Sequence, residues 1–309
     1  MTGKERAQIC LLRDGRLHLN DGPIDLIVDA TGEAGEIGAA YAAAASRFVE
    51  ILDELCSELP LLRAKAGTGS TMPAGPIARR MTKAVQPFAR EVFITPMAAV
   101  AGSVAEEILS VMTYSAKLSR ISVNNGGDIA IHLSHGQRYR IGIVSGLPDY
   151  FDSDSLSGSF DITSEDPSRG IATSGWKGRS FSLGIADAIT VLARTAAMAD
   201  AAATVIANAV DLPGNPAIVS VPACDLAPDS DLGHLLVTRH VGALSRDEIS
   251  LALSKGSAVA RDLHTRKLID SAALSLQGVI CTLQPENSRD WDASSTPVNP
   301  RQDREACHA

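Results

Sequence analysis

The chain has 309 residues, of which 45% are hydrophobic and 21% are charged, a balance typical of a globular protein with a sizeable core. Its formal net charge is -8, and no basic stripe is present to neutralise phosphates, which argues against nucleic-acid binding. Aromatic residues make up only 4%, so the core must be built from Ala, Val, Ile and Leu.

The five cysteines are widely scattered and form no C-x-x-C pair, so neither a disulfide framework nor a zinc site is expected. Residues 1–18 contain no apolar stretch of the length that a signal peptide needs. No apolar run approaches the ~20 residues of a membrane-spanning helix. We therefore expect a reduced, cytoplasmic protein without a membrane span.

Residues 7–29 have the pattern of three strands, and an Asp-Gly pair between the first two apolar runs predicts a hairpin. From residue 31 to 59, alanines and larger apolar residues recur at helical spacing, and Pro60 ends this helix. A second long helix is predicted after Pro96. Its first turns are rich in small residues, which suits close packing or a nearby ligand.

Further strands are predicted near 119–124, 128–134 and 138–145. Residues 146–168 are polar and rich in turn formers, so we expect an exposed connection or flap there. A strand at 187–192 and a helix from 195 to about 210 follow. This order favours an α+β fold, with mixed or antiparallel sheets packed against long helices, over a regular βαβ series.

A strand is predicted beyond Pro213, and a capping box at Ser245 begins helices that run through 257–276. Two such helices would pack across a two-fold axis, so a homodimer is one hypothesis for this region. The predicted domains are a core at 1–222, a strand and helical extension packed on it at 223–283, and a disordered tail at 284–309.

Three stretches contain residues that could bind a ligand or take part in catalysis. The first is NNGGD at 124–128, which interrupts a strand. Its two glycines permit positive φ and close backbone approach, so bare N–H groups there can contact a bound anion. A plain hairpin turn is the alternative, and it is favoured for this stretch taken alone.

The second stretch is GIATSGWKG at 170–178. Thr173 and Ser174 supply hydroxyls and Gly175 a flexible N–H donor, with two basic residues close behind, a composition that suits a phosphate or pyrophosphate. A Ser/Gly turn beside a solvated basic pair explains the same residues equally well.

The third stretch is MADAAAT at 198–204, in which Asp200 and Thr204 are four residues apart and therefore share one helix face. A carboxylate and a hydroxyl so placed can hold a hard divalent cation. A buried Asp in an alanine-rich helix requires compensation. Capping, or pairing with a nearby Arg such as Arg194, is the equally supported alternative.

In this order the three stretches resemble motifs of the ApbE-like superfamily, whose best-known members are FAD:protein FMN transferases. Residues 124–128 resemble its Asn-x-Gly-Gly-Asp turn, residues 172–175 its Ala-Thr-Ser-Gly strand end, and residues 199–204 its Ala-Asp-Ala-x-x-Thr helix. The resemblance covers roughly residues 7 to 222 and is closer to a shorter, largely uncharacterised branch.

The resemblance implies a T-fold-like architecture and a cleft for an FAD-like dinucleotide. It implies Mg2+ on Asp200 and Thr204, which would also serve catalysis by stabilising the departing AMP while an acceptor flavoprotein attacks the FMN phosphorus. The residues that would contact the flavin dinucleotide, or a similar small anionic ligand, are Asn124, Gly126, Gly127, Asp128, Thr173, Ser174 and Gly175.

The chain departs from the transferases in one segment. Their His-Ile-x-Asp-Pro-Arg-Thr-Gly sequence is replaced by SFSLGIADAITV, with Ser182 near the place of the His. Two hypotheses follow. One is a Mg2+-dependent FAD:protein FMN transferase, and the other is a protein that binds a flavin or another anionic metabolite without transferring it.

Overall fold

The structure is a computed structural model, and it describes residues 6–67, 69, 71–144, 156–283 and 306–308. The chain divides into two compact units. Unit 1 comprises Met1–Tyr139, Ile162–Ile171 and Arg194–Asp200, and unit 2 comprises Arg140–Asp161, Ala172–Ala193 and Ala201–Ala309.

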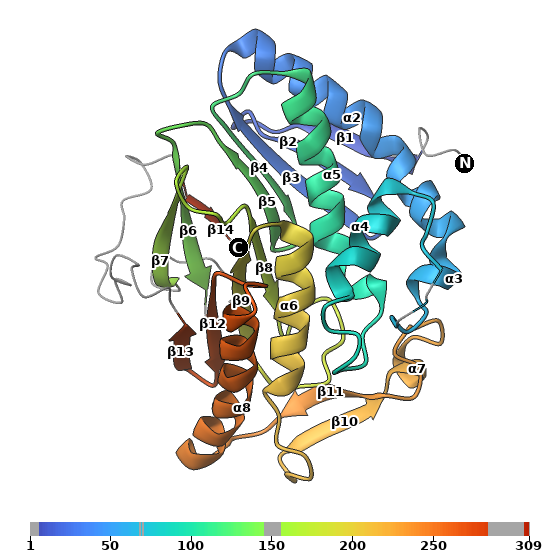
Figure 1. Ribbon diagram of the computed structural model, residues 1–309, viewed down its shortest axis with the longest axis vertical. Helices are drawn as coiled ribbons and strands as arrows, with labels where there is room; N and C mark the ends of the chain where they lie inside the picture. Colours follow the sequence, from blue (N-terminus) through green and yellow to red (C-terminus); the bar gives the residue numbers. More distant parts are fainter. Residues whose placement is uncertain (1–5, 68, 70, 145–155, 284–305, 309) are drawn as a thin grey trace. The chain divides into compact units, whose positions relative to one another are not determined.

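Unit 1 contains an antiparallel sheet in which five strands follow each other in chain order (Figure 1). These strands are β1 (Gln8–Leu11), β2 (Leu17–Asp21), β3 (Ile24–Thr31), β4 (Arg120–Asn125) and β5 (Asp128–Leu133). The helical elements of unit 1 are α2 (Ala34–Ser57), α3 (Leu59–Leu62), α4 (Pro76–Val85), the 3-10 helix η1 (Pro96–Ala99) and α5 (Val100–Ser115).

The core of unit 1 forms where helical and strand periodicities face each other. Alternate residues of β3 are buried, among them Leu26 and Val28, which are completely inaccessible to solvent. On α2 the buried residues include Phe48 and Ile51. Burying a side chain of this size contributes roughly 1.5–3 kcal/mol. The helix α2 packs beside α5 along the sheet (Figure 1).

Unit 2 contains three groups of strands. One is antiparallel and places β12 (Ser271–Leu276) between β9 (Ala188–Ala193) and β13 (Val279–Leu283). The second pairs β10 (Ile218–Pro222) with β11 (Leu236–Val241). The third contains β6 (Arg138–Val144), β7 (Leu156–Thr163) and β14 (Ala306–His308), with β14 parallel to β6.

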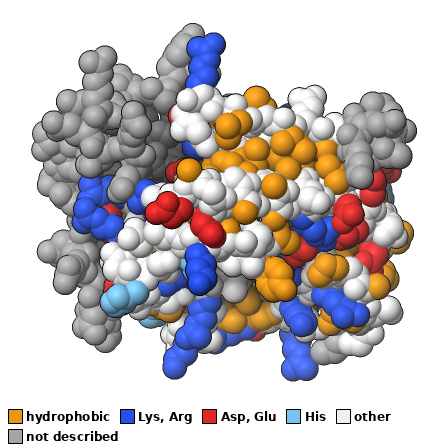
Figure 2. Space-filling view, turned by 90° about the horizontal axis from the view of Figure 1, so that it is seen from above, with side chains coloured by type: hydrophobic (Ala, Val, Ile, Leu, Met, Phe, Trp, Pro, Cys, Tyr) orange, Lys and Arg blue, Asp and Glu red, His pale blue; other side chains and the backbone are white. Residues whose placement is uncertain are grey.

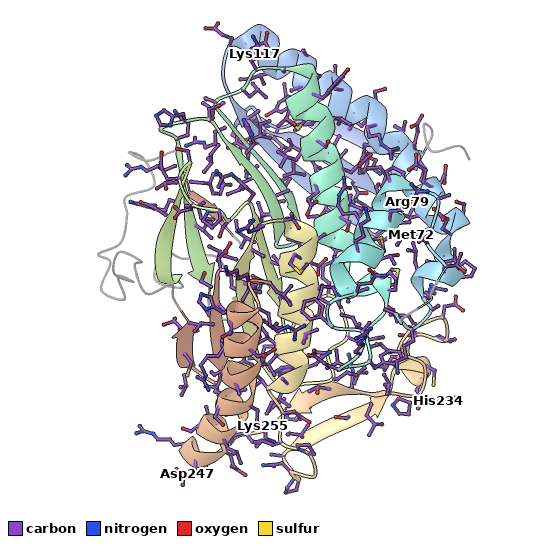
Figure 3. All side chains as sticks on the ribbon, in the orientation of Figure 1. Met72, Arg79, Lys117, His234, Asp247 and Lys255 are labelled. Atoms are coloured by element: carbon purple, nitrogen blue, oxygen red, sulfur yellow. The ribbon has the colours of Figure 1, made fainter. Side chains whose placement is uncertain are left out.

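The helices of unit 2 are α7 (Ala223–Leu226) and α8 (Arg246–Thr265), while α6 (Ala196–Ala209) and β8 (Gly170–Ser174) begin in unit 1 and continue into unit 2. Lys255 on α8 donates through Nζ to the Asp211 carbonyl oxygen at 2.8 Å, just beyond the end of α6 (Figure 3). A cation at that position is favourable because the carboxyl end of a helix carries partial negative charge.

The surface carries apolar as well as charged groups. Figure 2 shows a face on which hydrophobic side chains gather, with acidic and basic side chains around them. In unit 1, Leu11 on β1 is 65% exposed and Tyr114 near the end of α5 is 95% exposed. Within the described part of the chain, no helix is both long and apolar enough to cross a membrane.

The predicted α+β class with mixed and antiparallel sheets is confirmed, as are the first hairpin and the long helices at α2, α5 and α6. Residues 271–276, predicted to be helical, instead form β12. Its apolar run is buried between β9 and β13, and such a run cannot be distinguished from a buried helix by periodicity.

Within the expected connection at 146–168, residues 156–163 form strand β7. Residues 146–155 lie outside the described part of the chain. The predicted tail at 284–309 also lies outside the described residues, except for the three of β14.

The predicted capping box at the start of α8 is confirmed. Ser245 Oγ accepts a hydrogen bond from the Glu248 N–H at 3.3 Å, and Glu248 Oε2 accepts from the Ser245 N–H at 2.7 Å. Two N–H groups that lack partners within the helix are thereby satisfied.

Replacing Ser245→Ala should lower the free energy of unfolding by about 1 kcal/mol, because the first turn of α8 loses its cap. Urea denaturation measures this change. Ser254→Ala, in the interior of the same helix, is the matched control and should be neutral or slightly stabilising. Equal losses for the two variants would mean that the box does not stabilise the helix.

Candidate functional site

The first turn of α5 lies in backbone contact with the first turn of α6. A Cβ added to Gly102 would come 2.3 Å from the carbonyl oxygen of Ala196. No side chain fits there, so glycine is required by the close approach of the two helices. The close packing expected from the small residues after Pro96 is confirmed at this point.

The two helices also cap each other. Asp200 Oδ2, on α6, accepts a hydrogen bond from the Gly102 N–H of α5 at 3.0 Å. In return Glu106 Oε1, on α5, accepts from the Ala197 N–H of α6 at 2.7 Å. Both N–H groups lie in first helical turns, where they have no partner within their own helix. The capping alternative for Asp200 is therefore what the structure shows, and Arg194 is exposed.

Glu106 is held in place by an ionic network. Arg80 Nε lies 3.0 Å from Glu106 Oε2, and Arg80 Nη1 lies 3.1 Å from Glu107 Oε2. Glu107 in turn lies 2.8 Å from Arg47 Nε on α2. Sequence reasoning missed this network, although two adjacent glutamates in an otherwise apolar helix were a usable signal.

The NNGGD stretch forms a two-residue hairpin between β4 and β5. Gly126 has φ 65° and Gly127 has φ 109°, the positive values that this turn type requires. The Gly127 N–H donates to Asn124 Oδ1 at 2.8 Å, which closes the turn. The hairpin interpretation is thus correct for the local geometry, and Gly126 is exposed to solvent.

The hairpin is attached to α5 at the residue beside Gly102. Asn125 Nδ2 donates to the Ala101 carbonyl oxygen at 3.2 Å. Asp128 is the register partner of Asn125, so both side chains lie on the face of the sheet that α5 covers. Unit 1 by itself therefore brings the hairpin and Asp200 to two consecutive residues of α5. Sequence reasoning missed Asn125.

Burial raises the pKa of Asp200 to about 7, and the N–H groups of Gly102 and Ala101 oppose this shift by stabilising the ionised form. The residue keeps partial solvent access. A divalent cation near the carboxylate would lower its pKa again, because an opposite charge favours ionisation.

The residues predicted in the second stretch lie on β8 and its continuation. Thr173 Oγ1 lies 3.0 Å from Thr190 Oγ1 on β9, while Ser174 is partly exposed. A Cβ on Gly175 would come 2.3 Å from the Asp187 carbonyl oxygen, so glycine is required at that position too.

Asp187 is a second residue that the sequence did not reveal. Its Oδ1 accepts from Trp176 Nε1 at 3.2 Å and lies 2.8 Å from Lys177 Nζ, while its Oδ2 accepts from the Gln277 N–H at 2.6 Å. The side chain is only 9% exposed. Asp187 thus fixes the segment that follows Gly175.

Ser182, near the place of the transferase His, is buried. Its hydroxyl donates to Asn208 Oδ1 at 3.3 Å and accepts from the Gly184 N–H at 3.2 Å. This serine is a hydrogen-bonded core residue, so it offers no group to a ligand.

The donor set for a metal ion is sparse. No group of three or more His, Cys, Asp or Glu side chains suited to a metal occurs among the described residues. Asp200 and Thr204, one turn apart on α6 and both partly exposed, supply a carboxylate and a hydroxyl. Hard oxygen donors of this kind fit Mg2+, which often takes one or two carboxylates and completes its shell with waters or phosphates.

These features define an α+β protein in which a glycine hairpin and an acidic helix turn meet at the start of a third element, α5. The chain belongs to the family described as AbpE bacteria, whose model matches residues 9–282. The resemblance to an ApbE-like family is therefore confirmed.

Curated relatives are proteins named only by family. The UPF0280 protein MK0206 of Methanopyrus kandleri is 36% identical over 159 residues, which cover 51% of this chain and 59% of that protein. A UPF0280 protein of Methanothermobacter thermautotrophicus is 41% identical over 141 residues, covering 44% and 49%. The chain thus spans about half the length of the curated relatives it matches.

Among solved structures, the apo flavinyl transferase ApbE of Pseudomonas stutzeri is similar with a TM-score of 0.42 and 12% identity, covering 91% of this chain and 94% of that one. The flavin transferase ApbE of Vibrio cholerae has a TM-score of 0.39 and 13% identity, covering 91% and 98%.

Replacing Gly102→Ala should destabilise the protein by at least about 2 kcal/mol, because the new methyl group would overlap the Ala196 carbonyl oxygen. Gly38→Ala is the matched control. Gly38 is an exposed position of α2 with open space around it, and the change should stabilise by about 0.5–1 kcal/mol. Chemical denaturation compares the two, and a tolerated Gly102→Ala would contradict the backbone contact.

The raised pKa of Asp200 predicts a pH dependence. Between the usual pKa of 3.8 and the folded value of about 7, the folded carboxyl holds a proton that the unfolded one has lost. The free energy of unfolding that the protonated Asp200 contributes therefore falls as pH rises from about 4 to 7, by roughly 3 kcal/mol. Asp200→Asn keeps the acceptor for Gly102 and should lack this dependence.

Denaturation of both proteins without divalent cation, from pH 4.5 to 8, gives the difference in unfolding free energy. Titrating groups that do not interact with Asp200 cancel in that difference. A difference that stays constant over this range would show that the carboxyl has an ordinary pKa.

Proposed function

We propose that this protein is an ApbE-type flavin-site protein that binds FAD together with Mg2+. One observation supports it above the others. Two stretches far apart in sequence, the hairpin and the Asp200 turn, hydrogen bond to the consecutive residues Ala101 and Gly102. This convergence brings the hairpin and the carboxylate to the same turn of α5, where one ligand could contact both.

In this proposal Gly126 lets the backbone approach the pyrophosphate, because it has no side chain and is exposed. Asn124 keeps the turn closed through the Gly127 N–H, and Asp128 lies beside Asn125 on the α5 side of the sheet. Thr173 and Ser174 orient phosphate oxygens, and Gly175 offers its backbone N–H to the same group.

Asp200 and Thr204 would hold the Mg2+. When bound, Mg2+ supplies positive charge that stabilises phosphate oxygens and a departing phosphate group. Asp200 can bind it while remaining a cap, because Oδ2 serves Gly102 and the carboxylate has a second oxygen.

The reaction that such a site supports is transfer of FMN to a protein. A threonine or serine hydroxyl of an acceptor flavoprotein would form a bond to the FMN phosphorus as it loses its proton. The bond between that phosphorus and the bridging oxygen would break, and AMP would leave. We propose the cytoplasm as the place of this reaction, as the sequence suggests.

A second candidate is binding without transfer, and the burial of Ser182 favours it. The hydroxyl is committed to Asn208 and Gly184, so nothing at this position replaces the transferase His.

The hypothesis of a homodimer through residues 245–276 remains a prediction, now with the single helix α8 in place of a pair.

FAD should raise the melting temperature of the protein in Mg2+ and much less in EDTA, because ligands that bind the folded state stabilise it. Thr204→Val should weaken the apparent Mg2+ affinity roughly 10-fold by removing one ligand oxygen. Thr204→Ser retains the hydroxyl and is the control. Equal Mg2+ affinity in the Val and Ser variants would exclude Thr204 as a ligand.

Release of AMP distinguishes the two candidates. The protein is incubated with FAD, Mg2+ and acceptor flavoproteins, and AMP is measured by chromatography. Transfer predicts AMP together with an acceptor whose mass increases by one FMN unit, and Asp200→Ala should abolish both. If FAD binds but no acceptor leads to AMP release, transfer is excluded and binding without transfer is the remaining function.

A further inference from the structure

Trp176 is an aromatic side chain for which the proposed function has as yet no role. It follows Thr173, Ser174 and Gly175 directly, and the chain has only two tryptophans. The backbone N–H of Trp176 donates to the Ala186 carbonyl oxygen at 3.0 Å. The backbone of Trp176 is therefore fixed beside residues proposed to contact phosphate.

The indole of Trp176 is also fixed. Its Nε1 donates to Asp187 Oδ1 at 3.2 Å, and Asp187 is itself anchored by the Gln277 N–H at 2.6 Å. The Asp187 side chain is 9% exposed, so this anchor is shielded from water. A tryptophan held in this way is already ordered before any ligand arrives.

Lys177 is placed over the indole ring. Its Nζ lies 5.5 Å from the ring centroid and 2.8 Å from Asp187 Oδ1, so its charge has a partner. A cation over one side of an indole is favourable because the ring face is electron-rich. Trp176 nevertheless remains partly exposed. Asp187 and Lys177 therefore orient an indole that remains partly accessible to solvent.

We propose that Trp176 is the stacking contact for a planar heteroaromatic ring of the bound dinucleotide, either the isoalloxazine or the adenine. The inference rests on the proposed flavin site. Stacking on a preordered indole costs little additional entropy, and aromatic side chains contribute substantially to the binding of planar bases. Trp176 acts as a binding residue that selects ligands carrying such a ring.

The test uses the full chain in Mg2+, with calorimetric titration of FAD into wild type, Trp176→Phe and Trp176→Leu. Phe still stacks, so its Kd should stay within about 3-fold of wild type, while Leu should raise the Kd roughly 10-fold. Circular dichroism and melting temperature check that each variant is folded. Separate titrations with FMN and ADP show which of the two rings loses affinity in Trp176→Leu.

A second measurement needs no variant. N-bromosuccinimide oxidises accessible indoles, and peptide mass mapping reads the oxidation of Trp176. Bound FAD should slow that oxidation several-fold, whereas inorganic pyrophosphate with Mg2+ should not, because it carries no ring.

The outcomes separate this inference from the proposed function. FAD that binds wild type and Trp176→Leu equally, without protecting the indole, overturns the stacking role and leaves the flavin site standing. Absence of FAD binding to wild type overturns both. Selective loss of FMN or of ADP affinity in Trp176→Leu supports the proposal and identifies the ring.

Discussion

The backbone contact between Gly102 and Ala196 is the constraint on which the rest of the candidate site depends. Because Gly102 has no side chain, the two first turns can approach closely, and each obtains a hydrogen-bond acceptor from the other helix. Asp200 therefore has a fixed position before any ligand binds. Preorganisation of this kind lets a site hold a cation without first ordering its ligand.

The acidic residues near α5 differ in how their charges are compensated. Glu106 and Glu107 are matched by Arg80 and Arg47, so their charges are compensated within unit 1. Asp200 accepts hydrogen bonds from backbone N–H groups, and burial raises its pKa although those N–H groups oppose the shift. A buried carboxylate compensated only by dipoles is where an added divalent cation contributes most.

The sequence predicted the elements with strong local signals. Helices α2, α5 and α6 have long apolar periodicities, and Ser245 with Glu248 marks the start of α8. Residues 271–276 were misassigned because a central buried strand lacks the alternation of a half-exposed one. Its partners β9 and β13 are what determine its conformation, and pairing of that kind is not visible in a six-residue window.

The same contrast between local and long-range signals applies to the residues around the candidate site. Motif residues such as Asp200 and Gly127 could be found from their local spacing. Asn125, Glu106 and Asp187 could not, because their roles are long-range hydrogen bonds to Ala101, Ala197 and Gln277. Local spacing identifies candidate ligands, whereas the groups that hold them in place come from distant parts of the chain.

The central claim is that Asp200 and Thr204 jointly hold a divalent cation when a flavin dinucleotide binds. Anomalous diffraction from crystals grown with FAD and Mn2+ in place of Mg2+ tests it most directly. The account predicts one strong anomalous peak within bonding distance of Asp200 Oδ1 and Thr204 Oγ1, with a phosphate oxygen completing the shell. A manganese peak elsewhere, with both side chains free of it, would contradict the account.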